Sequence, residues 1–196
     1  MPISKVDFYS LVRKEGLFKK LSQKQVMSID YILNYWDASG YKDLRWLAYM
    51  LATVYHETAA TMLPIEEWGK GKGRKYGKKV KYSGVPYTSP DKVYYGRGYV
   101  MITWYEVYEM MGKILGVPLL QNPELALDID VAAKIMFEGM LSAHSSFGDF
   151  TGKSLEMYFN NKVNDPVNAR RIINGTDKAK LIVGYHEKFL RCLKSN

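Results

Sequence analysis

The stretch Trp46-Leu-Ala-Tyr-Met-Leu-Ala-Thr-Val-Tyr55 decides the fold, because it is ten residues long, uncharged and apolar on nearly every side of a helix. A helix of this kind belongs in the centre of a domain, where other elements cover all of its faces. We expect it to begin near Asp43 and to end at about Thr58. A helix needs about 20 apolar residues to cross a bilayer, so this stretch is too short and predicts no stable membrane insertion.

Amphipathic helices are expected around this central helix. Ser22 is the expected N-cap of the helix before it, Gly40 ends that helix, and a still earlier helix around Phe8 closes at Gly16. Apolar spacing predicts further helices over residues 103–115, 129–143, 155–159, 166–173 and 177–193. In the last of these, the expected buried side carries Leu181, Ile182, Tyr185, Phe189, Cys192 and Leu193. A length of 196 residues fits one mainly α domain over residues 1–196.

Residues 69–90, here called the basic loop, interrupt the helical pattern and predict a long loop or at most a short hairpin. Between Gly69 and Tyr82 there are seven basic residues, four glycines and no acidic residue, and two prolines follow. The basic residues are Lys70, Lys72, Arg74, Lys75, Lys78, Lys79 and Lys81. With the net charge of +8, the basic loop favours polyanionic partners: nucleic acid, an anionic membrane or the anionic polymers of a bacterial cell wall.

Cysteine and histidine usage narrows the chemistry. The single cysteine, Cys192, excludes an internal disulfide and a multi-cysteine zinc site, and we expect it to be a small buried residue. The pair His56-Glu57 lacks the second histidine of zinc proteases, because Ala60 stands at the required spacing, so neither a metal nor another cofactor is predicted. The first residues carry charge where a signal peptide has its apolar stretch, which predicts synthesis in the cytoplasm without an export signal.

Two groups of carboxylates are candidates for chemistry. Glu57 ends the apolar helix, where poor solvation favours the protonated form of a carboxylic acid and suits it to act as a general acid. Glu66 and Glu67 follow beyond Pro64, so we expect them on a loop. A protonated carboxyl and a carboxylate on two sides of a cleft are the groups that hydrolyse a glycosidic bond. The alternatives are structural: an ion pair at the helix end for Glu57, and neutralisation of the basic loop for Glu66 and Glu67.

Three segments carry a resemblance to a known family. They are Tyr55-His-Glu-Thr-Ala-Ala-Thr-Met-Leu-Pro-Ile-Glu-Glu-Trp-Gly69, Tyr94-Tyr-Gly-Arg-Gly-Tyr-Val-Met-Ile-Thr-Trp104 and Asp165-Pro-Val-Asn-Ala-Arg-Arg-Ile-Ile-Asn-Gly-Thr-Asp177. Together they resemble glycoside hydrolase family 19, the plant-type chitinases and their bacterial and phage lysozyme-like relatives. The resemblance covers roughly residues 44–193 and implies a lysozyme-like helical domain with a small β or loop excursion around residues 69–103. A short chain without paired cysteines looks more like the phage endolysins than the plant enzymes.

The resemblance implies roles for five polar side chains. Glu57 matches the general acid of the family. Glu67 matches the second carboxylate, and Glu66, one residue away, is the alternative. Thr103 stands where the family has the hydroxyl that holds the hydrolytic water, and Asn174 matches an asparagine that binds substrate.

The second of the three segments adds two candidates and two departures from the family's pattern. Arg97 is expected in the cleft floor near the acids, and Tyr95 is a candidate to contact a sugar, among tyrosines that mostly fit the core. Met101 stands where the family has a glutamine, and Val107 where it has a sugar-binding asparagine. Both departures remove polar contacts to the amides of chitin, so they weaken the chitinase interpretation more than the hydrolase interpretation.

We therefore expect an endolysin-type glycosidase, a muramidase that hydrolyses the amino-sugar backbone of peptidoglycan. It would be a monomer, would reach the cell wall after release or delivery, and would hold anionic wall polymer with the basic loop. The alternative enzyme is a chitinase that hydrolyses β-1,4-N-acetylglucosamine polymers. An alternative of another class is a non-catalytic module that binds glycan or nucleic acid. Nucleic acid is not the expected partner, because few aromatic residues stand among the basic ones.

Overall fold

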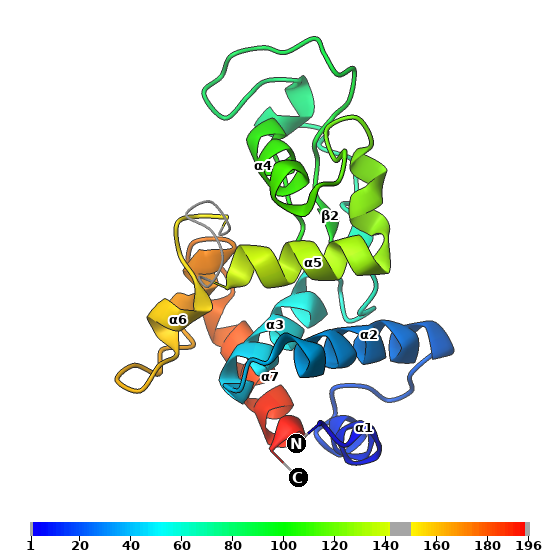
Figure 1. The fold of residues 1–196 in the computed structure, drawn as a ribbon, viewed down its shortest axis with the longest axis vertical. Helices are drawn as coiled ribbons and strands as arrows, with labels where there is room; N and C mark the ends of the chain where they lie inside the picture. Colours follow the sequence, from blue (N-terminus) through cyan, green and yellow to red (C-terminus); the bar gives the residue numbers. More distant parts are fainter. Residues whose placement is uncertain (1, 142–149, 195–196) are drawn as a thin grey trace.

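The computed structural model describes residues 2–141 and 150–194, and most of this chain is helical (Figure 1). The α-helices are α1 (Lys5–Lys14), α2 (Gln23–Ser39), α3 (Leu44–Glu57), α4 (Tyr105–Leu115), α5 (Ile129–Met140), α6 (Leu155–Tyr158) and α7 (Ala179–Leu193). The 3-10 helices are η1 (Lys75–Lys78), η2 (Pro123–Leu127) and η3 (Asn168–Ile172), and the strands are β1 (Ile65–Glu66) and β2 (Arg97–Gly98). The predicted mainly α fold class is confirmed.

Helix α3 lies in the middle of the fold, with α7 packed along it (Figure 1). Every residue from Leu47 to Val54 is buried, as the uncharged stretch predicts. Asp43 caps the first turn by accepting a hydrogen bond from the backbone N–H of Arg45, and the helix ends at Glu57. No helix within residues 2–141 and 150–194 is long and apolar enough to cross a membrane.

The flanking helices begin and end largely where the sequence places them. Ser22 and Gln25 form a capping box at the start of α2, and Gly40 ends α2 in the left-handed conformation at φ 80°. Helix α5 ends at Met140; the predicted continuation at residues 142–143 lies outside the described residues. The stretch 166–173 is the short 3-10 helix η3 rather than an α-helix.

One predicted buried residue of α7 is exposed. Leu181 has 45% of its surface accessible, because the buried face follows the spacing of its neighbours Ile182, His186, Phe189 and Leu193. Residues three and four apart share a helix face, and Leu181 lies to the side of that row. The prediction for Cys192 is confirmed, since it is 2% exposed.

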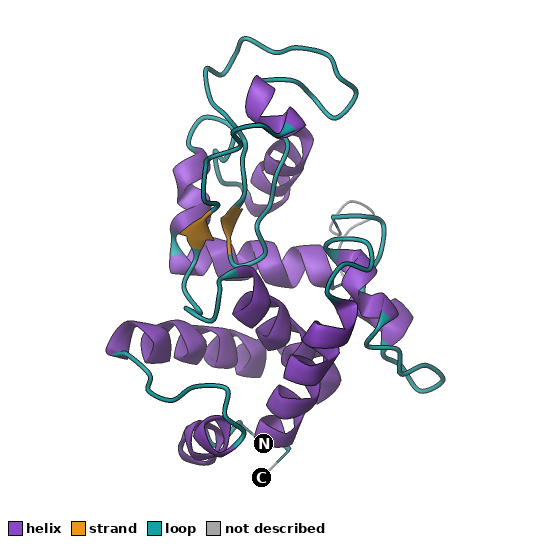
Figure 2. Ribbon diagram, turned by 180° about the vertical axis from the view of Figure 1, so that it is seen from behind, coloured by secondary structure: helices purple, strands orange, loops and turns teal. Residues whose placement is uncertain are grey.

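The β excursion is smaller than the sequence suggests. Strands β1 and β2 pair antiparallel, with Ile65 opposite Gly98 and Glu66 opposite Arg97 (Figure 2). The basic loop precedes β2 and is confirmed as a loop, with η1 inside it and one isolated bridge between Val80 and Pro86.

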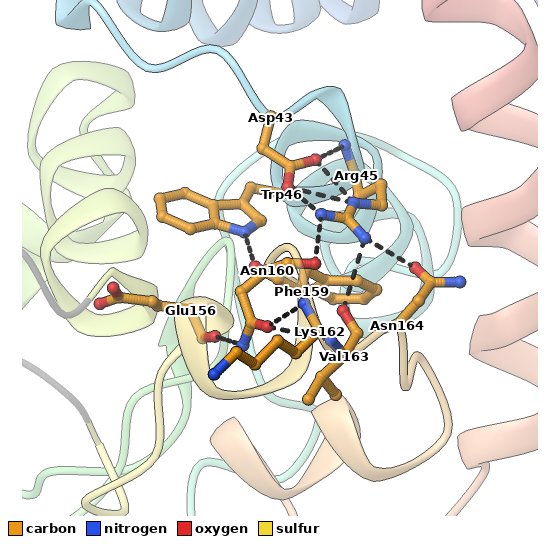
Figure 3. A network of polar contacts seen from close by, with 9 residues as sticks. All are labelled: Asp43, Arg45, Trp46, Glu156, Phe159, Asn160, Lys162, Val163 and Asn164. Carbon is orange, nitrogen blue, oxygen red and sulfur yellow. Dashed lines mark hydrogen bonds and ion pairs between the residues drawn. The ribbon is translucent and has the colours of Figure 1, made fainter.

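Arg45 ties the start of α3 to a distant hairpin (Figure 3). Its guanidinium pairs with Asp43 and donates to the carbonyl oxygens of Asn160 and Val163 and to Oδ1 of Asn164, at 3.2, 3.5 and 3.3 Å. One arginine thus satisfies three acceptors of a turn that lies more than a hundred residues away in the sequence.

The indole of the next residue extends this contact. Trp46 donates from Nε1 to the carbonyl oxygen of Phe159 at 2.9 Å. The side chain of Asn160 then closes the hairpin on itself, because it donates to the carbonyl oxygen of Glu156 and accepts from the backbone N–H groups of the second and third residues after it (Figure 3). The hairpin around Asn160, which precedes η3 in the chain, is therefore held in place against the start of α3.

Replacing Arg45 with Ala should lower the free energy of unfolding by about 2 kcal/mol, because hydrogen bonds from a charged group contribute about 1.5–3 kcal/mol. Urea unfolding measures the change. Lys162→Ala is the matched control, since its exposed side chain lies on the same hairpin and its contact there uses the backbone. Equal unfolding free energies for both variants would contradict the role given to Arg45.

Candidate active site

A cleft of about 1300 Å³ opens where the end of α3, the chain after β1, the basic loop and the start of α4 meet residues 150–151 and 173–175. Its polar side chains include Glu57, Glu67, Arg74, Tyr76, Thr103, Glu106 and Asn174. Among the predicted site residues, Glu57, Glu67, Thr103 and Asn174 line the cleft, and Glu66, Arg97 and Tyr95 do not.

Glu57 reaches the cleft as the last residue of α3, and it is paired. Its Oε1 accepts a hydrogen bond of 2.6 Å from Nη1 of Arg170, and its side chain is 17% exposed. Arg170 comes from η3, is 2% exposed and donates from Nε to the carbonyl oxygen of Asp177 at 3.0 Å. The isolated carboxyl expected from the sequence is thus replaced by an ion pair, because η3 brings a buried cation against the helix end. The structural alternative for Glu57, an ion pair at the helix end, is confirmed, and its role as the general acid stays a prediction.

A sharp turn after α3 sets the path to the next carboxylates. Ala59 and Ala60 both adopt left-handed backbone conformations, at φ 49° and 63°. The hydroxyl of Thr58 accepts a hydrogen bond from the backbone N–H of Met62 at 3.0 Å and so fastens the turn. The chain then leads to β1, whose last residue is Glu66, and Glu67 follows it.

Glu66 ends β1 and Glu67 follows it, and the two carboxylates have different partners. Glu66 accepts hydrogen bonds of 2.8 Å from Lys70 and from the hydroxyl of Tyr95, and these bonds, that of Lys70 first, lower the pKa of Glu66. Glu67 lines the cleft, where its Oε2 accepts a 2.8 Å hydrogen bond from the hydroxyl of Tyr76. The structure therefore brings Glu67, and not Glu66, into the cleft with Glu57.

Thr103 is presented to the cleft by a tight reversal of the chain. The backbones of Arg97 and Ile102 bond in both directions, at 3.3 and 3.1 Å, and the N–H of Trp104 donates to the carbonyl oxygen of Tyr94 at 2.9 Å. Trp104 has φ 73° and ψ 143°, a conformation that costs a residue with a side chain about 1–3 kcal/mol. The surrounding hydrogen bonds hold this strained backbone at the cleft wall.

Arg97 lies under the cleft and not in its floor, contrary to the expectation. Its side chain is 2% exposed, donates to the carbonyl oxygen of Val93 and to the hydroxyl of Tyr108, and stacks 3.6 Å from the ring centre of Tyr95. Tyr95 is 9% exposed and turns its hydroxyl to Glu66. Both side chains support the chain around β2 from inside the core, because residues 94–99 are all buried and the cleft lining begins only at Val100 in this segment.

The described residues contain no cluster for a metal ion. Within residues 2–141 and 150–194, no three His, Cys, Asp or Glu side chains lie close enough to share one. His144 lies outside the described residues. Burial lowers the pKa of His56, the neighbour of Glu57, so this imidazole is neutral at pH 7.

Comparison with known sequences gives two partial matches. No family model matches the chain. Two endochitinases of Arabidopsis thaliana are 37% and 40% identical to it over 81 residues, which are 41% of this chain and 26% of each relative. The match thus spans about a quarter of the length of these curated relatives.

Comparison with solved structures covers nearly the whole chain. Chitinase C from Streptomyces griseus superposes with a TM-score of 0.59 at 21% identity, over 97% of this chain and 92% of that one. A bacterial family 19 chitinase gives 0.58 at 19% identity, over 100% and 97%. A class IV chitinase from Zea mays gives 0.52 at 20% identity, over 98% and 93%. This is the fold of the family 19 chitinases. The resemblance to glycoside hydrolase family 19 that the sequence carries is confirmed.

Several residues at the cleft were not predicted from the sequence as site residues. Arg170, Tyr76, Arg74 and Glu106 all touch the carboxylates or line the cleft. For Arg170 the sequence holds only a weak signal: two arginines stand between the apolar positions Ala169 and Ile172, and the pattern does not say which of them is buried. Arg74 and Tyr76 lie in the basic loop, whose conformation the residue pattern does not specify. Glu106 lies on the predicted helix 103–115, but the helical pattern does not say that its side chain reaches a cleft.

Replacing Arg170 with Met in this family 19 fold should lower the free energy of unfolding by about 3 kcal/mol, because the largely buried Glu57 then loses its partner. Adding Glu57→Gln removes the unpaired charge and should recover part of the loss. Urea unfolding of both single variants and the double variant measures this, with the exposed neighbour Arg171→Met as control. The same loss with and without Glu57→Gln would mean that the ion pair does not carry the effect.

Proposed function

We propose that this protein is a glycoside hydrolase of the chitinase type, which cleaves β-1,4-linked N-acetylglucosamine polymers. The observation that carries the proposal is the meeting of Glu57 and Glu67 in one cleft, from two different elements, while the adjacent Glu66 is bound outside it. The likeness of the fold to family 19 chitinases supports the same class of reaction. A module that only binds glycan would not need two carboxylates at this place.

Each of the two carboxyl groups transfers one proton in the reaction. Glu57 donates a proton to the glycosidic oxygen as the bond from that oxygen to the anomeric carbon breaks. Glu67 accepts a proton from a water molecule that attacks the same carbon from the opposite face, so the product has inverted configuration. Thr103 lines the same cleft with a hydroxyl that can orient this water, and Asn174 offers an amide to the sugar.

The size of the cleft fits a polymer better than a small molecule. Pockets for small ligands are typically about 300–1,000 Å³, and this cleft is about 1300 Å³. The aromatic side chains of Trp104 and Phe150 are part of its lining and offer flat apolar faces for sugar rings. An endo-acting enzyme, which binds several sugars of one chain at a time, fits such a cleft.

Glu57→Gln and Glu67→Gln should each lower the rate of glycan hydrolysis by at least about 100-fold, because each removes a group that transfers a proton in the transition state. Glu66→Gln is the matched control, since its side chain is bound by Lys70 and Tyr95 outside the cleft. Release of new reducing ends from the polymer measures the rate. A loss confined to Glu66→Gln would move the second carboxylate to that position, and full activity of Glu57→Gln would refute the hydrolase.

Peptidoglycan is the second candidate substrate, and the composition of the cleft favours it. Met101 and Val107 line the cleft and offer no hydrogen bonds to the acetamido groups that every sugar of chitin carries. Arg74 of the basic loop lines the same cleft and can pair with the carboxylates of peptidoglycan, which uncharged chitin lacks. On this candidate the protein is an endolysin-type muramidase that reaches the cell wall after release from the cytoplasm.

One enzyme preparation assayed on both polymers decides between the substrates, with Glu57→Gln as the blank. The chitinase proposal expects turnover of chitin oligosaccharides that equals or exceeds that of purified peptidoglycan. If peptidoglycan is the substrate, each unmet amide costs about 1–3 kcal/mol on chitin, and the preference should reach about ten-fold or more. The basic loop would then add a salt-dependent part, because exposed charges act over about 8 Å at physiological ionic strength.

A further inference from the structure

The basic loop is fastened to the body of the fold beside the cleft. The backbone N–H of Tyr82 donates to Glu106 of α4 at 2.8 Å. The ammonium of Lys81 lies 4.7 Å from the ring centre of Tyr105, within the range of a cation–π contact. The loop therefore has a defined conformation on the side that faces the cleft, while exposed lysines such as Lys72 and Lys75 stay on its outside.

A close crossing of the chain with itself shapes the loop. A Cβ on Gly77 would lie 2.0 Å from the carbonyl oxygen of Gly71, and a Cβ on Gly71 would lie 2.9 Å from Cα of Gly77. Only glycine fits at such a distance between two backbones. The 3-10 helix η1 includes Gly77, so the crossing fixes where its second residue, Tyr76, stands.

Tyr76 is held by two contacts. Its hydroxyl donates to Oε2 of Glu67 at 2.8 Å, and its ring meets the ring of Trp104 edge-on, with centres 5.7 Å apart. Burial, together with the bond to Glu67, raises the pKa of Tyr76 to about 12. The hydroxyl thus keeps its proton, and remains a donor, across the pH range in which a pair of carboxyl groups can hydrolyse a glycoside.

Glu67 is confined between this hydroxyl and the backbone at Gly96, directly before β2. A Cβ on Gly96 would lie 3.1 Å from Oε2 of Glu67, so the chain at residue 96 packs closely behind the carboxylate. The backbone N–H of Glu67 donates to the carbonyl oxygen of Gly96 at 2.8 Å. The backbone of Glu67 is therefore fixed by the strand, and Tyr76 fixes its carboxylate.

We propose that Tyr76 is a positioning residue for Glu67, a role that rests on the proposed hydrolase function. Its hydrogen bond engages Oε2 and holds the carboxylate plane in one orientation, which leaves Oε1 for the attacking water. Without the bond the carboxylate rotates and meets the water in the productive geometry for only part of the time. Substrate binding depends on the rest of the cleft and changes little, so the loss falls on kcat and not on KM.

Tyr87 supplies a matched control for a hydroxyl that only anchors the loop. It belongs to the same loop, is 8% exposed and donates to the carbonyl oxygen of Lys92 at 3.2 Å. It does not line the cleft. Tyr87→Phe and Tyr76→Phe therefore each delete one hydroxyl of the basic loop and keep the ring. Only Tyr76→Phe removes a hydrogen bond to Glu67.

The test is the steady-state kinetics of both variants on the polymer that the wild-type protein cleaves, with circular dichroism as the check of folding. Tyr76→Phe should lower kcat by about 10- to 100-fold and leave KM within about two-fold, because a misplaced catalytic group costs about this much. Tyr87→Phe should leave both constants within about two-fold. A kcat of Tyr76→Phe within about two-fold of wild type, or equal changes in both variants, would overturn the proposal.

A second measurement separates positioning from loop stability. In the Glu67→Gln background, Tyr76→Phe should change the residual rate by less than about two-fold, because the carboxylate that it positions is absent. The same fold-loss in both backgrounds would show that the hydroxyl acts through the loop and would refute positioning. A wild-type protein that cleaves neither chitin nor peptidoglycan would overturn the proposed function and this role together. An active wild type with an unchanged Tyr76→Phe would overturn this role alone.

Discussion

Burial of α3 on all sides is the constraint on which the rest of the structure depends. Because residues 47–54 have no polar face, other helices must cover them, and only the two ends of α3 emerge from the core. Both ends are fastened to the same later part of the chain: Arg45 and Trp46 to the hairpin around Asn160, and Glu57 to Arg170. The position of Glu57, the proposed acid, is thus set by the packing of α3 in the core. The contacts of Arg45 at one end of the helix and the ion pair with Arg170 at the other hold the helix in place.

The sequence predicts the parts of the fold whose cause is local. The uncharged stretch specifies a central helix, Ser22 and Gly40 specify the ends of α2, and the acid at the end of α3 follows from the same helix. The choice between Glu66 and Glu67 is different, because it depends on the register of a two-residue strand. A shift of one residue exchanges the side chains on the two faces, and the pairing of β1 with the distant β2, Ile65 with Gly98 and Glu66 with Arg97, fixes it.

Contacts between distant segments explain what the sequence did not predict. Arg170 lies 113 residues after Glu57, and no local pattern joins the two. Arg97 was expected near the acids, and its backbone is indeed there, but its side chain turns to the core because Val93, Tyr95 and Tyr108 offer it acceptors and rings. A motif can therefore locate a segment correctly and still give the wrong side of it.

The basic loop has two properties, a high positive charge and aromatic side chains, and its composition points only to the first. Its charge dominates the sequence and predicts an exposed arm for polyanions, yet its Tyr76 and Tyr82 line the cleft and pack against the ring of Trp104. The two properties use alternate sides of one loop, since Lys75 and Lys78 are exposed while Tyr76 between them is half-buried. A loop of this kind can influence both the capture of a polymer and the chemistry performed on it.

Thr103 and Trp104 both line the cleft, but the strained backbone at Trp104 makes their contributions to it independent. Thr103 offers a hydroxyl, and Trp104 offers an aromatic wall. The hydrogen bond to Tyr94 and the bonds between Arg97 and Ile102 hold this conformation through main-chain atoms alone. The orientation of Thr103 is therefore independent of the identity of the side chain that follows it. A different side chain at position 104 would therefore change the aromatic wall of the cleft without moving the hydroxyl of Thr103.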